Sequence, residues 1–438
     1  YQLSLKTVLK APLHFKHQGS YHLSRVRFSR SQLPFPVSVA EGKVDLSNEG
    51  VQGSDLHVVF LQSSLLMKGA WKWDGKSHPF EIFARGRVDL KNLLALSQSP
   101  LFPEDIRSKW KGIDGLSGTS QLSFKGQSTQ ERPFAYDVEV TPKDGSMLLK
   151  GVSSPLVLRE GTFAFSDQGV SFSNAKVQYG PSALMLDGWV KERQLNFSTS
   201  GSIDLESFHS LVRSPLFSDQ AESFIHEIRE LSGKADFRLR ARGNMEEGLH
   251  LLREGEVRFR GATLHHRRLP APFSSLEGTL LVSPGTIRFV GIKGKLGESP
   301  VDLTGSLSRF PPPQGSPVGM GRALSFQLTS PQLDLYALFP KRETPAPLSF
   351  LKVRNWLSTW SIDGRVNIDR GKFLGFPYRN LKGQMTTTDG KLIFYPFQFE
   401  AEGGDLWGQG WVESTPDGIR LEIQPRLSNM EAQGFLRA

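Results

Sequence analysis

The sequence predicts a mainly β fold: an elongated, twisted and curled antiparallel sheet whose repeating units form a hydrophobic groove, with short helical insertions. Three observations predict it. Glycines recur at a fixed spacing, apolar and polar residues alternate along the segments between them, and short stretches with a helical pattern interrupt the alternation.

The glycine pattern occurs four times. In each copy a middle glycine follows the first by 7 or 8 residues, and a last glycine follows the first by 27. Glycines that separate strand-like runs predict three strands per copy, and we expect the repeated glycines at turns or bulges. The four sets are Gly42, Gly50 and Gly69; Gly161, Gly169 and Gly188; Gly278, Gly285 and Gly305; and Gly383, Gly390 and Gly410.

Strict alternation marks the strands between these glycines. Along residues 233–243, apolar side chains occupy every second position and lysine, aspartate or arginine occupies the positions between them. A period of two places the apolar side chains on one face of a sheet whose other face is wet. The residues expected to line the groove are Tyr136, Val138, Phe163, Phe165, Phe237, Leu239, Val257, Phe259, Phe326, Leu328, Phe397 and Phe399.

Helical patterns lie between the repeats. Asp89 is a predicted N-cap of a helix that ends before Pro100, and Asp204 repeats this arrangement 115 residues later. A second helix is predicted from Ser218 to Leu231, and Gly233 is expected to end it. Apolar stripes with the same spacing, expected to pack into the core, are Ile106, Trp110 and Ile113, and Val353, Trp356, Leu357 and Trp360.

The repeats predict how the chain is divided. Residues 35–153, 154–268 and 269–375 are expected to be groove repeats, residues 1–34 the end of a truncated repeat, and residues 376–438 a partial one. Both ends of the sequence look like cuts through a longer array, so we expect the chain to be a fragment.

Composition narrows the function classes. The 438 residues include no cysteine, which excludes disulfides, thiolate metal sites and a cysteine nucleophile. The net charge of +9 is spread along strands instead of forming blocks, which favours a solvated strand face over a nucleic-acid-binding surface. A basic rim that attracts anionic lipid headgroups is compatible with this interpretation.

Chemical motifs are scarce. Adjacent residues of a strand point in opposite directions, so His265 and His266 are expected at a surface turn rather than as a metal-ligand pair. His14, His17 and His22 have no carboxylate nearby at metal-ligand spacing. The glycines at 319 and 321 lack the third glycine of a dinucleotide-binding loop. The sequence therefore predicts no enzyme, no cofactor and no metal.

The repeated unit resembles the AsmA-like superfamily. The resemblance rests on the proline lead, the three glycine-punctuated strands, and the final unit from Gly383 to Val412, which is similar to the C-terminal region of that superfamily. The helices that begin with Asp-Leu resemble its larger members, of the YhdP and TamB type. The resemblance implies a bridge-like lipid transfer protein in the periplasm of a Gram-negative-type bacterium, anchored in the inner membrane at full length.

The same resemblance implies the partners. They are phospholipid, the membranes at the ends of the full-length protein and other envelope proteins, with no nucleic acid. A phospholipid exposes roughly 30 methylenes, so shielding it from water is worth on the order of 24 kcal/mol, and an apolar groove supplies that shield. The alternative is a non-transport scaffold or an assembly factor for outer-membrane proteins, whose apolar face would be filled by its own side chains.

Overall fold

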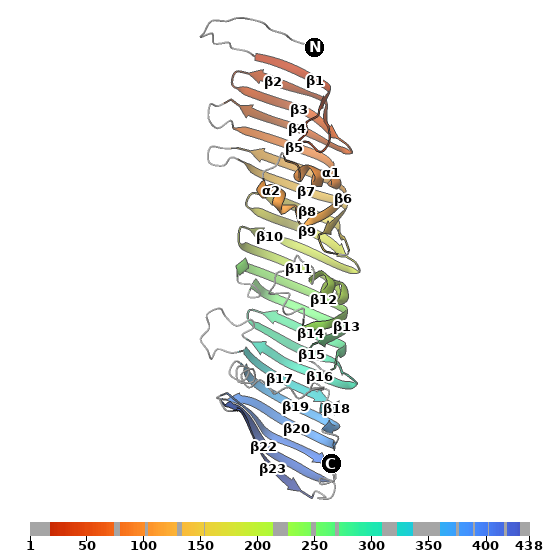
Figure 1. Ribbon diagram of the computed structural model, residues 1–438, viewed down its shortest axis with the longest axis vertical. Coiled ribbons are helices and arrows are strands. Elements are labelled where there is room, and N and C mark those ends of the chain that lie inside the picture. The colour runs from red at the N-terminus through yellow and green to blue at the C-terminus, as the bar shows by residue number, and fades with distance from the viewer. Residues whose placement is uncertain are drawn as a thin grey trace. The chain divides into compact units, whose positions relative to one another are not determined.

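The structure is a computed structural model that describes residues 18–73, 79–100, 104–128, 134–152, 154–212, 227–246, 251–267, 271–308, 322–335, 360–373, 376–388, 390–401, 403–415 and 418–429. These residues form 23 strands and three short helices, α1 (Leu90–Ser97), α2 (Glu104–Lys109) and α3 (Leu205–Val212). The strands belong to one open sheet, so the predicted mainly β fold is confirmed (Figure 1).

The chain folds as two compact units, which divide within β9 (Gly169–Tyr179). These two compact units do not test the predicted boundaries of the repeats, which remain a prediction. Besides most of β9, the first unit holds β1 (Gln18–Phe28), β2 (Val37–Ser47), β3 (Gly50–Phe60), β4 (Ser63–Lys72), β5 (Phe80–Asp89), β6 (Ile113–Gln127), β7 (Ala135–Leu149) and β8 (Leu156–Ser166), with α1 and α2.

The second unit holds the other strands and α3. Its strands are β10 (Ser182–Lys191), β11 (Gln194–Asp204), β12 (Ile228–Asn244), β13 (Leu252–His266), β14 (Phe273–Ser283), β15 (Thr286–Leu296), β16 (Ser299–Ser308), β17 (Arg322–Ser330), β18 (Leu333–Asp334), β19 (Trp360–Phe373), β20 (Phe376–Thr388), β21 (Lys391–Ala401), β22 (Gly404–Thr415) and β23 (Gly418–Ser428).

Within each unit, strands that follow one another in sequence pair side by side, as Figure 1 shows. The pairs are antiparallel, as predicted, with one exception. β17 and β18 both pair with β19 in parallel, because the chain returns to begin β19 at the same end as β17. Residues 336–359, which connect β18 to β19, lie outside the described residues.

The glycine repeats correspond to triplets of strands: β2–β4, β8–β10, β14–β16 and β20–β22. Middle glycines such as Gly285 stand at the turns, as predicted. Gly42, Gly278 and Gly383 stand beside bulges in the register, also as predicted. The last glycines, Gly69, Gly188, Gly305 and Gly410, lie inside β4, β10, β16 and β22, opposite residues of the next strand. Gly69, Gly305 and Gly410 also stand beside bulges in the pairing with the preceding strand, as predicted.

Both Asp-Leu helices begin where the sequence predicts. The Asp89 carboxylate accepts hydrogen bonds from the backbone N–H groups of Lys91 at 2.9 Å and Asn92 at 3.2 Å, and so caps α1. The Asp204 carboxylate accepts from the N–H of Ser207 at 2.9 Å at the start of α3. Each cap satisfies donors that the first turn of a helix leaves free. None of the helices among the described residues is long and apolar enough to cross a membrane.

The other helical stripes are only partly right: Ile106 lies in α2, but most of the remaining residues that the structure describes are in strands. Ile228 and Leu231 belong to β12, Ile113 to β6 and Trp360 to β19. Pairing with a neighbouring strand overrides the local spacing: Leu231 lies opposite Leu264 of β13, and Ile228 is buried there. Residues 213–226, which hold the rest of the predicted Ser218 helix, lie outside the described residues, as do Val353, Trp356 and Leu357.

The Asp89 cap can be tested by mutation. Asp89→Ala removes the acceptor for two N–H groups of α1 and should lower the free energy of unfolding by about 1 kcal/mol. Asp89→Asn keeps an acceptor and should lower the free energy of unfolding by only a few tenths of a kcal/mol. Urea denaturation measures both. Asp137→Ala, at an exposed position of β7 in the same unit, is the control; an equal loss in this control would contradict the capping role.

Tyr378 predicts a pH dependence at high pH. Its hydroxyl donates to the Leu333 carbonyl at 2.8 Å, and burial, with a smaller contribution from the Asp334 carboxylate, raises its pKa to about 12. Tyrosine in an unfolded chain titrates near pH 10. The neutral hydroxyl therefore stabilises the fold fully below roughly pH 10, and this contribution is lost as the pH rises through the folded pKa.

The measurement is the free energy of unfolding from urea titrations across that pH range. The difference between the original chain and Tyr378→Phe should shrink as the pH rises, because phenylalanine has no proton to lose. A difference that stays constant with pH would show that the Tyr378 pKa is not raised on folding.

Candidate functional site

The second unit has an apolar face that the register of the strands makes continuous. One residue from each strand, from β10 to β17 and from β19 to β23, lies directly opposite the next, and none of them is polar or charged. In order they are Leu184, Gly201, Phe237, Val257, Leu280, Phe289, Gly305, Phe326, Gly364, Met385, Phe394, Gly410 and Ile423.

The first unit has an apolar face of the same kind. One row contains a residue from each strand from β1 to β8: Val26, Val39, Val58, Leu65, Gly86, Leu122, Val140 and Phe163. A second row runs parallel to it, from β1 to β7: Tyr21, Val44, Gly53, Gly69, Ile82, Gly126 and Tyr136. Directly opposed residues of neighbouring strands point to the same side, so these rows define one face of the unit.

All the residues predicted to line the groove lie on these two faces. Tyr136, Val138, Phe163 and Phe165 belong to the first unit. The other predicted residues belong to the second unit and are Phe237, Leu239, Val257, Phe259, Phe326, Leu328, Phe397 and Phe399. Every one of these side chains is half-buried: none is covered completely, and none stands fully in water.

The opposite face of each unit, here called the polar face, carries the charges. In the second unit Arg238 lies opposite both Ser200 and Glu256. Ion pairs cross the same region, from Arg258 to Glu256 at 3.0 Å and from Arg240 to Glu254 at 3.3 Å. The basic residues of β12 and β13 therefore form the solvated strand face that the sequence predicts, and the charge separates cleanly from the apolar side.

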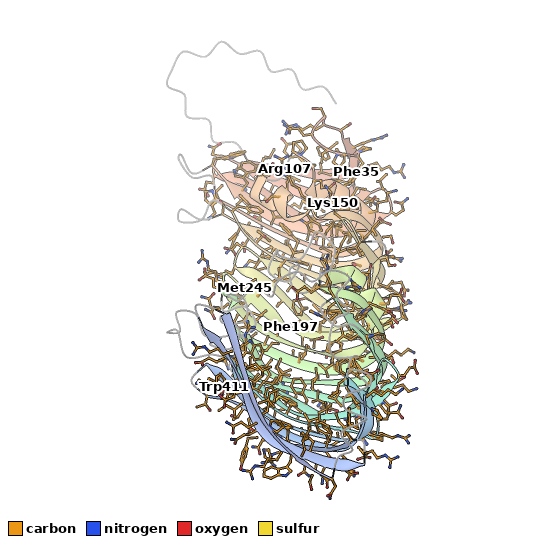
Figure 2. All side chains as sticks on the ribbon, turned by 60° about the horizontal axis from the view of Figure 1, so that its bottom comes forward. Phe35, Arg107, Lys150, Phe197, Met245 and Trp411 are labelled. Atoms are coloured by element: carbon orange, nitrogen blue, oxygen red, sulfur yellow. The ribbon has the colours of Figure 1, made fainter. Side chains whose placement is uncertain are left out.

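The strands of the second unit bend around the apolar face. In Figure 2, Phe197 lies on the inside of the bend and Trp411 on the outside. The register agrees, since Phe197 pairs with Gly188 and Ala241 on the apolar face, whereas Trp411 pairs with Ile393 and Glu422 on the polar face. The apolar face of this unit is thus the floor of a groove.

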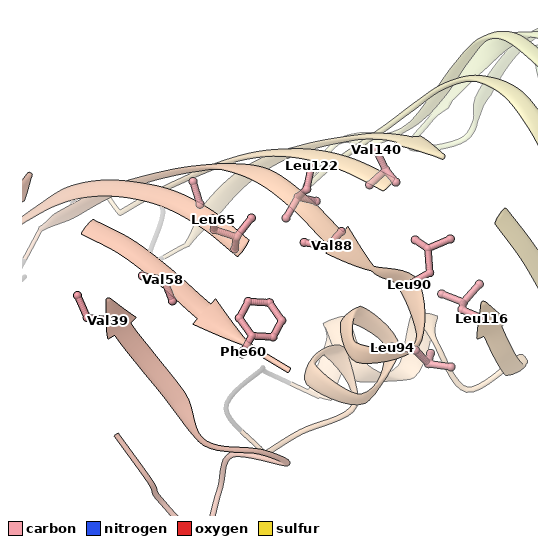
Figure 3. Close-up of a cluster of buried hydrophobic side chains, with 11 residues drawn as sticks. Val39, Val58, Phe60, Leu65, Val88, Leu90, Leu94, Leu116, Leu122 and Val140 are labelled. Carbon is pink, nitrogen blue, oxygen red and sulfur yellow. The ribbon is translucent and has the colours of Figure 1, made fainter. Parts of the chain in front are cut away.

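Buried hydrophobic side chains form three clusters: one beside α1, one beside α3, and one among β15, β16, β18, β19 and β20 that contains Leu296, Leu333 and Ile368. In the first unit, Leu90 and Leu94 of α1 belong to one buried cluster with Val88 and Leu116, and Figure 3 shows these side chains around α1 and the adjoining strands. In the second unit, Leu205 of α3 packs with Ala235 and Ala262. The sequence contains 30 phenylalanines, yet Phe60 is the one buried phenylalanine among the described residues. A closed core of this size would bury many more.

The repeated glycines lie among the large side chains of the apolar faces. Gly188 lies opposite Phe197, Gly305 opposite Phe289 and Phe326, and Gly410 opposite Phe394. The sequence does not predict this arrangement, because the spacing of glycines along the chain does not show which residues lie opposite them on the neighbouring strands. A glycine beside a phenylalanine leaves room for the ring, which explains glycines in the interior of strands.

Other chemistry on the described residues is limited. No group of histidines, aspartates and glutamates among them is arranged to hold a metal ion. Two shallow hollows lie on the polar faces, one beside Lys125 and Asp137 and one beside Arg238 and Glu256, so neither belongs to the groove. His265 and His266 end strand β13 rather than forming the expected turn, because the strand continues its pairing with β12 to that point. His266 also contacts the Glu227 carboxylate at 3.1 Å.

Comparisons with known proteins give no match. No family model matches the chain, no curated protein is similar to it, and no solved structure matches its fold. The resemblance to the AsmA-like superfamily therefore remains a prediction.

The equivalent glycines of two repeats should respond differently to alanine. Gly278 has φ of 125°, and a Cβ placed on it would lie 2.8 Å from the Ile292 Cα, a backbone atom that cannot easily move. Gly383 has no such strain, and its Cβ would meet only the Phe397 Cβ at 4.0 Å. Gly278→Ala should therefore lower the free energy of unfolding by about 2 kcal/mol, whereas Gly383→Ala should change it by less than about 0.5 kcal/mol. Equal losses, measured by urea denaturation, would contradict this structural difference.

Proposed function

We propose that this chain binds phospholipid by its acyl chains along the apolar faces and carries it between the inner and outer membranes without chemical change. The full-length protein would be anchored in the inner membrane and would act in the periplasm. Phospholipid, the two membranes and other envelope proteins would be its partners. The membranes and the compartment come from the resemblance to the AsmA-like superfamily, whereas the apolar faces support a lipid as the ligand.

One observation carries the proposal: an uncharged row of apolar residues and glycines that crosses the second unit from β10 to β23, in which every side chain except the exposed Ile423 is half-buried. Apolar surface left partly open to water marks a binding site when it is contiguous and large. At about 4.8 Å between neighbouring strands, the row is on the order of 60 Å long. That length exceeds several-fold the roughly 15 Å of hydrocarbon in one leaflet of a bilayer, so the surface has room for more than one lipid.

Energetics favour a lipid over a small polar ligand. Each methylene removed from water contributes about 0.8 kcal/mol, and the apolar face gains by losing its own contact with water at the same time. The headgroup needs no partner on the floor of the groove, where the central row offers neither charge nor hydrogen bond. The groove would therefore hold lipids by their tails and leave the headgroups in water.

The alternative function is that of a scaffold or an assembly factor. The buried clusters beneath α1 and α3 favour it, since there the protein covers its apolar face with its own side chains. These clusters occupy only part of each face, however, and the predicted groove residues stay half-open. The photo-cross-linking experiment described in the next paragraph distinguishes between the two functions.

A photoreactive amino acid at Leu239 or Val257 should capture phospholipid when the purified chain is irradiated after incubation with phospholipid vesicles. Both positions lie on the apolar face of the second unit. The matched controls are Arg238 and Arg258, which neighbour them in sequence but point to the polar face, and these should capture no lipid. Mass spectrometry of the adducts reads the result. Capture at none of the four positions, or equally at all four, would contradict the proposal.

A carboxylate on the floor should stop lipid transfer. Leu239→Asp places a charge among apolar neighbours where an acyl chain would otherwise lie, and a desolvated charge costs several kcal/mol. Transfer of a fluorescent phospholipid between donor and acceptor vesicles should fall to the level without protein. Ser200→Asp adds the same charge to the polar face of the neighbouring strand and should leave transfer unchanged. Circular dichroism establishes that both variants are folded.

A further inference from the structure

We propose that Gly364 determines the depth of the groove where β17, β19 and β20 meet, because it allows the ring of Phe326 to lie flat on the sheet. This inference rests on the proposed function and adds a specificity to it. The flat ring leaves room for hydrocarbon chains that are wider than an unbranched acyl chain, and a side chain at position 364 would remove that room.

The geometry is unusually close. Phe326 and Gly364 are directly opposed across the parallel pair of β17 and β19, and Met385 of β20 flanks Gly364 on its other side. A Cβ on Gly364 would lie 2.5 Å from both Cε1 and Cζ of Phe326 and 2.9 Å from Cγ of Met385. The outer edge of the Phe326 ring therefore occupies the space above Gly364, and Gly364 itself is buried.

Phe326 has a glycine on each side. Gly305 of β16 is its partner on the other edge of β17, and a Cβ there would lie 3.1 Å from the Phe326 Cβ. Side chains of a strand ordinarily stand roughly perpendicular to the sheet, where neighbours on both sides support them. A phenylalanine between two glycines lacks that support, so its ring tips over and covers the exposed glycine backbone.

The same arrangement recurs on both apolar faces. The Phe397 ring tip would lie 3.1 Å from a Cβ on Gly408 of the neighbouring strand, and the Phe124 ring tip 2.8 Å from a Cβ on Gly126 two residues along its own strand. Rings that lie on glycines give the groove an apolar floor without bulk. The tightest of these three contacts is the one at Gly364, and for this reason we select it for the test.

A methyl group at position 364 would displace the Phe326 ring, because a clash at 2.5 Å with an aromatic carbon cannot be absorbed by small shifts. We expect the displaced ring to rise from the sheet into the groove. The raised ring narrows the groove at this point. A methyl-branched chain, whose cross-section is larger, should be excluded more strongly than an unbranched one.

The test measures lipid bound to the full 438-residue chain. The original chain and Gly364→Ala are incubated separately with vesicles of dioleoyl phosphatidylcholine and of diphytanoyl phosphatidylcholine, recovered, and analysed for bound lipid by mass spectrometry. The expected result is a loss of diphytanoyl lipid in Gly364→Ala of roughly tenfold in affinity, which corresponds to about 1.4 kcal/mol, with a smaller loss of dioleoyl lipid.

Two further variants make the result specific. Gly383→Ala adds a methyl group to the same face of the next strand without a clash, and it should bind both lipids as the original chain does. Gly364→Ala combined with Phe326→Leu removes the ring that would rise, and it should recover binding of the branched lipid. A purely structural role of Gly364 predicts a lower unfolding temperature in Gly364→Ala with no preference between the lipids.

The outcomes separate this inference from the proposed function. If the original chain binds neither lipid, the proposed function fails. If the original chain binds lipid and Gly364→Ala binds both lipids as Gly383→Ala does, or if the double variant does not recover the branched lipid, the proposed function stands and the role of Gly364 is wrong.

Discussion

The register of the strands is the constraint on which the other features depend. Side chains alternate between the two faces, so a shift by one residue at any pair would place apolar residues in water and charges in the groove. Phe237 pairs with Val257, and Val257 pairs with Leu280, so the same apolar face continues from β12 to β14. Even the parallel pair of β17 and β19 keeps it, since Phe326 lies opposite Gly364.

The two faces solve different problems. On the polar face, ion pairs such as Arg258–Glu256 keep charges hydrated while they neutralise one another in part, and each contributes little to stability. On the apolar face, α1 and α3 cover only part of the surface, where Leu90 and Leu205 are buried. A third buried cluster contains Leu296 and Ile368. The predicted groove residues stay half-open, which is costly for a protein that has no ligand and useful for one that binds hydrocarbon.

Much of this arrangement can be read from the sequence. Alternation places Phe237, Leu239, Val257 and Phe259 on one face, because a period of two has only one geometric outcome in a strand. The caps at Asp89 and Asp204 are equally local, since the carboxylate reaches N–H groups two or three residues away. By contrast, Ile228 and Leu231 have helical spacing but lie in β12, because pairing with β13 outweighs a weak local preference.

The sequence by itself determined the alternating strands, the two caps and the face to which the side chains of those strands point, since these depend on residues a few positions apart. Only the tertiary structure decided which residues lie opposite one another on neighbouring strands. That Phe326 lies over Gly364, with 37 residues between them, depends on a parallel pairing that no short-range pattern specifies. This pairing also explains the glycines inside the strands, because a neighbouring strand places an aromatic ring against a backbone that carries no side chain.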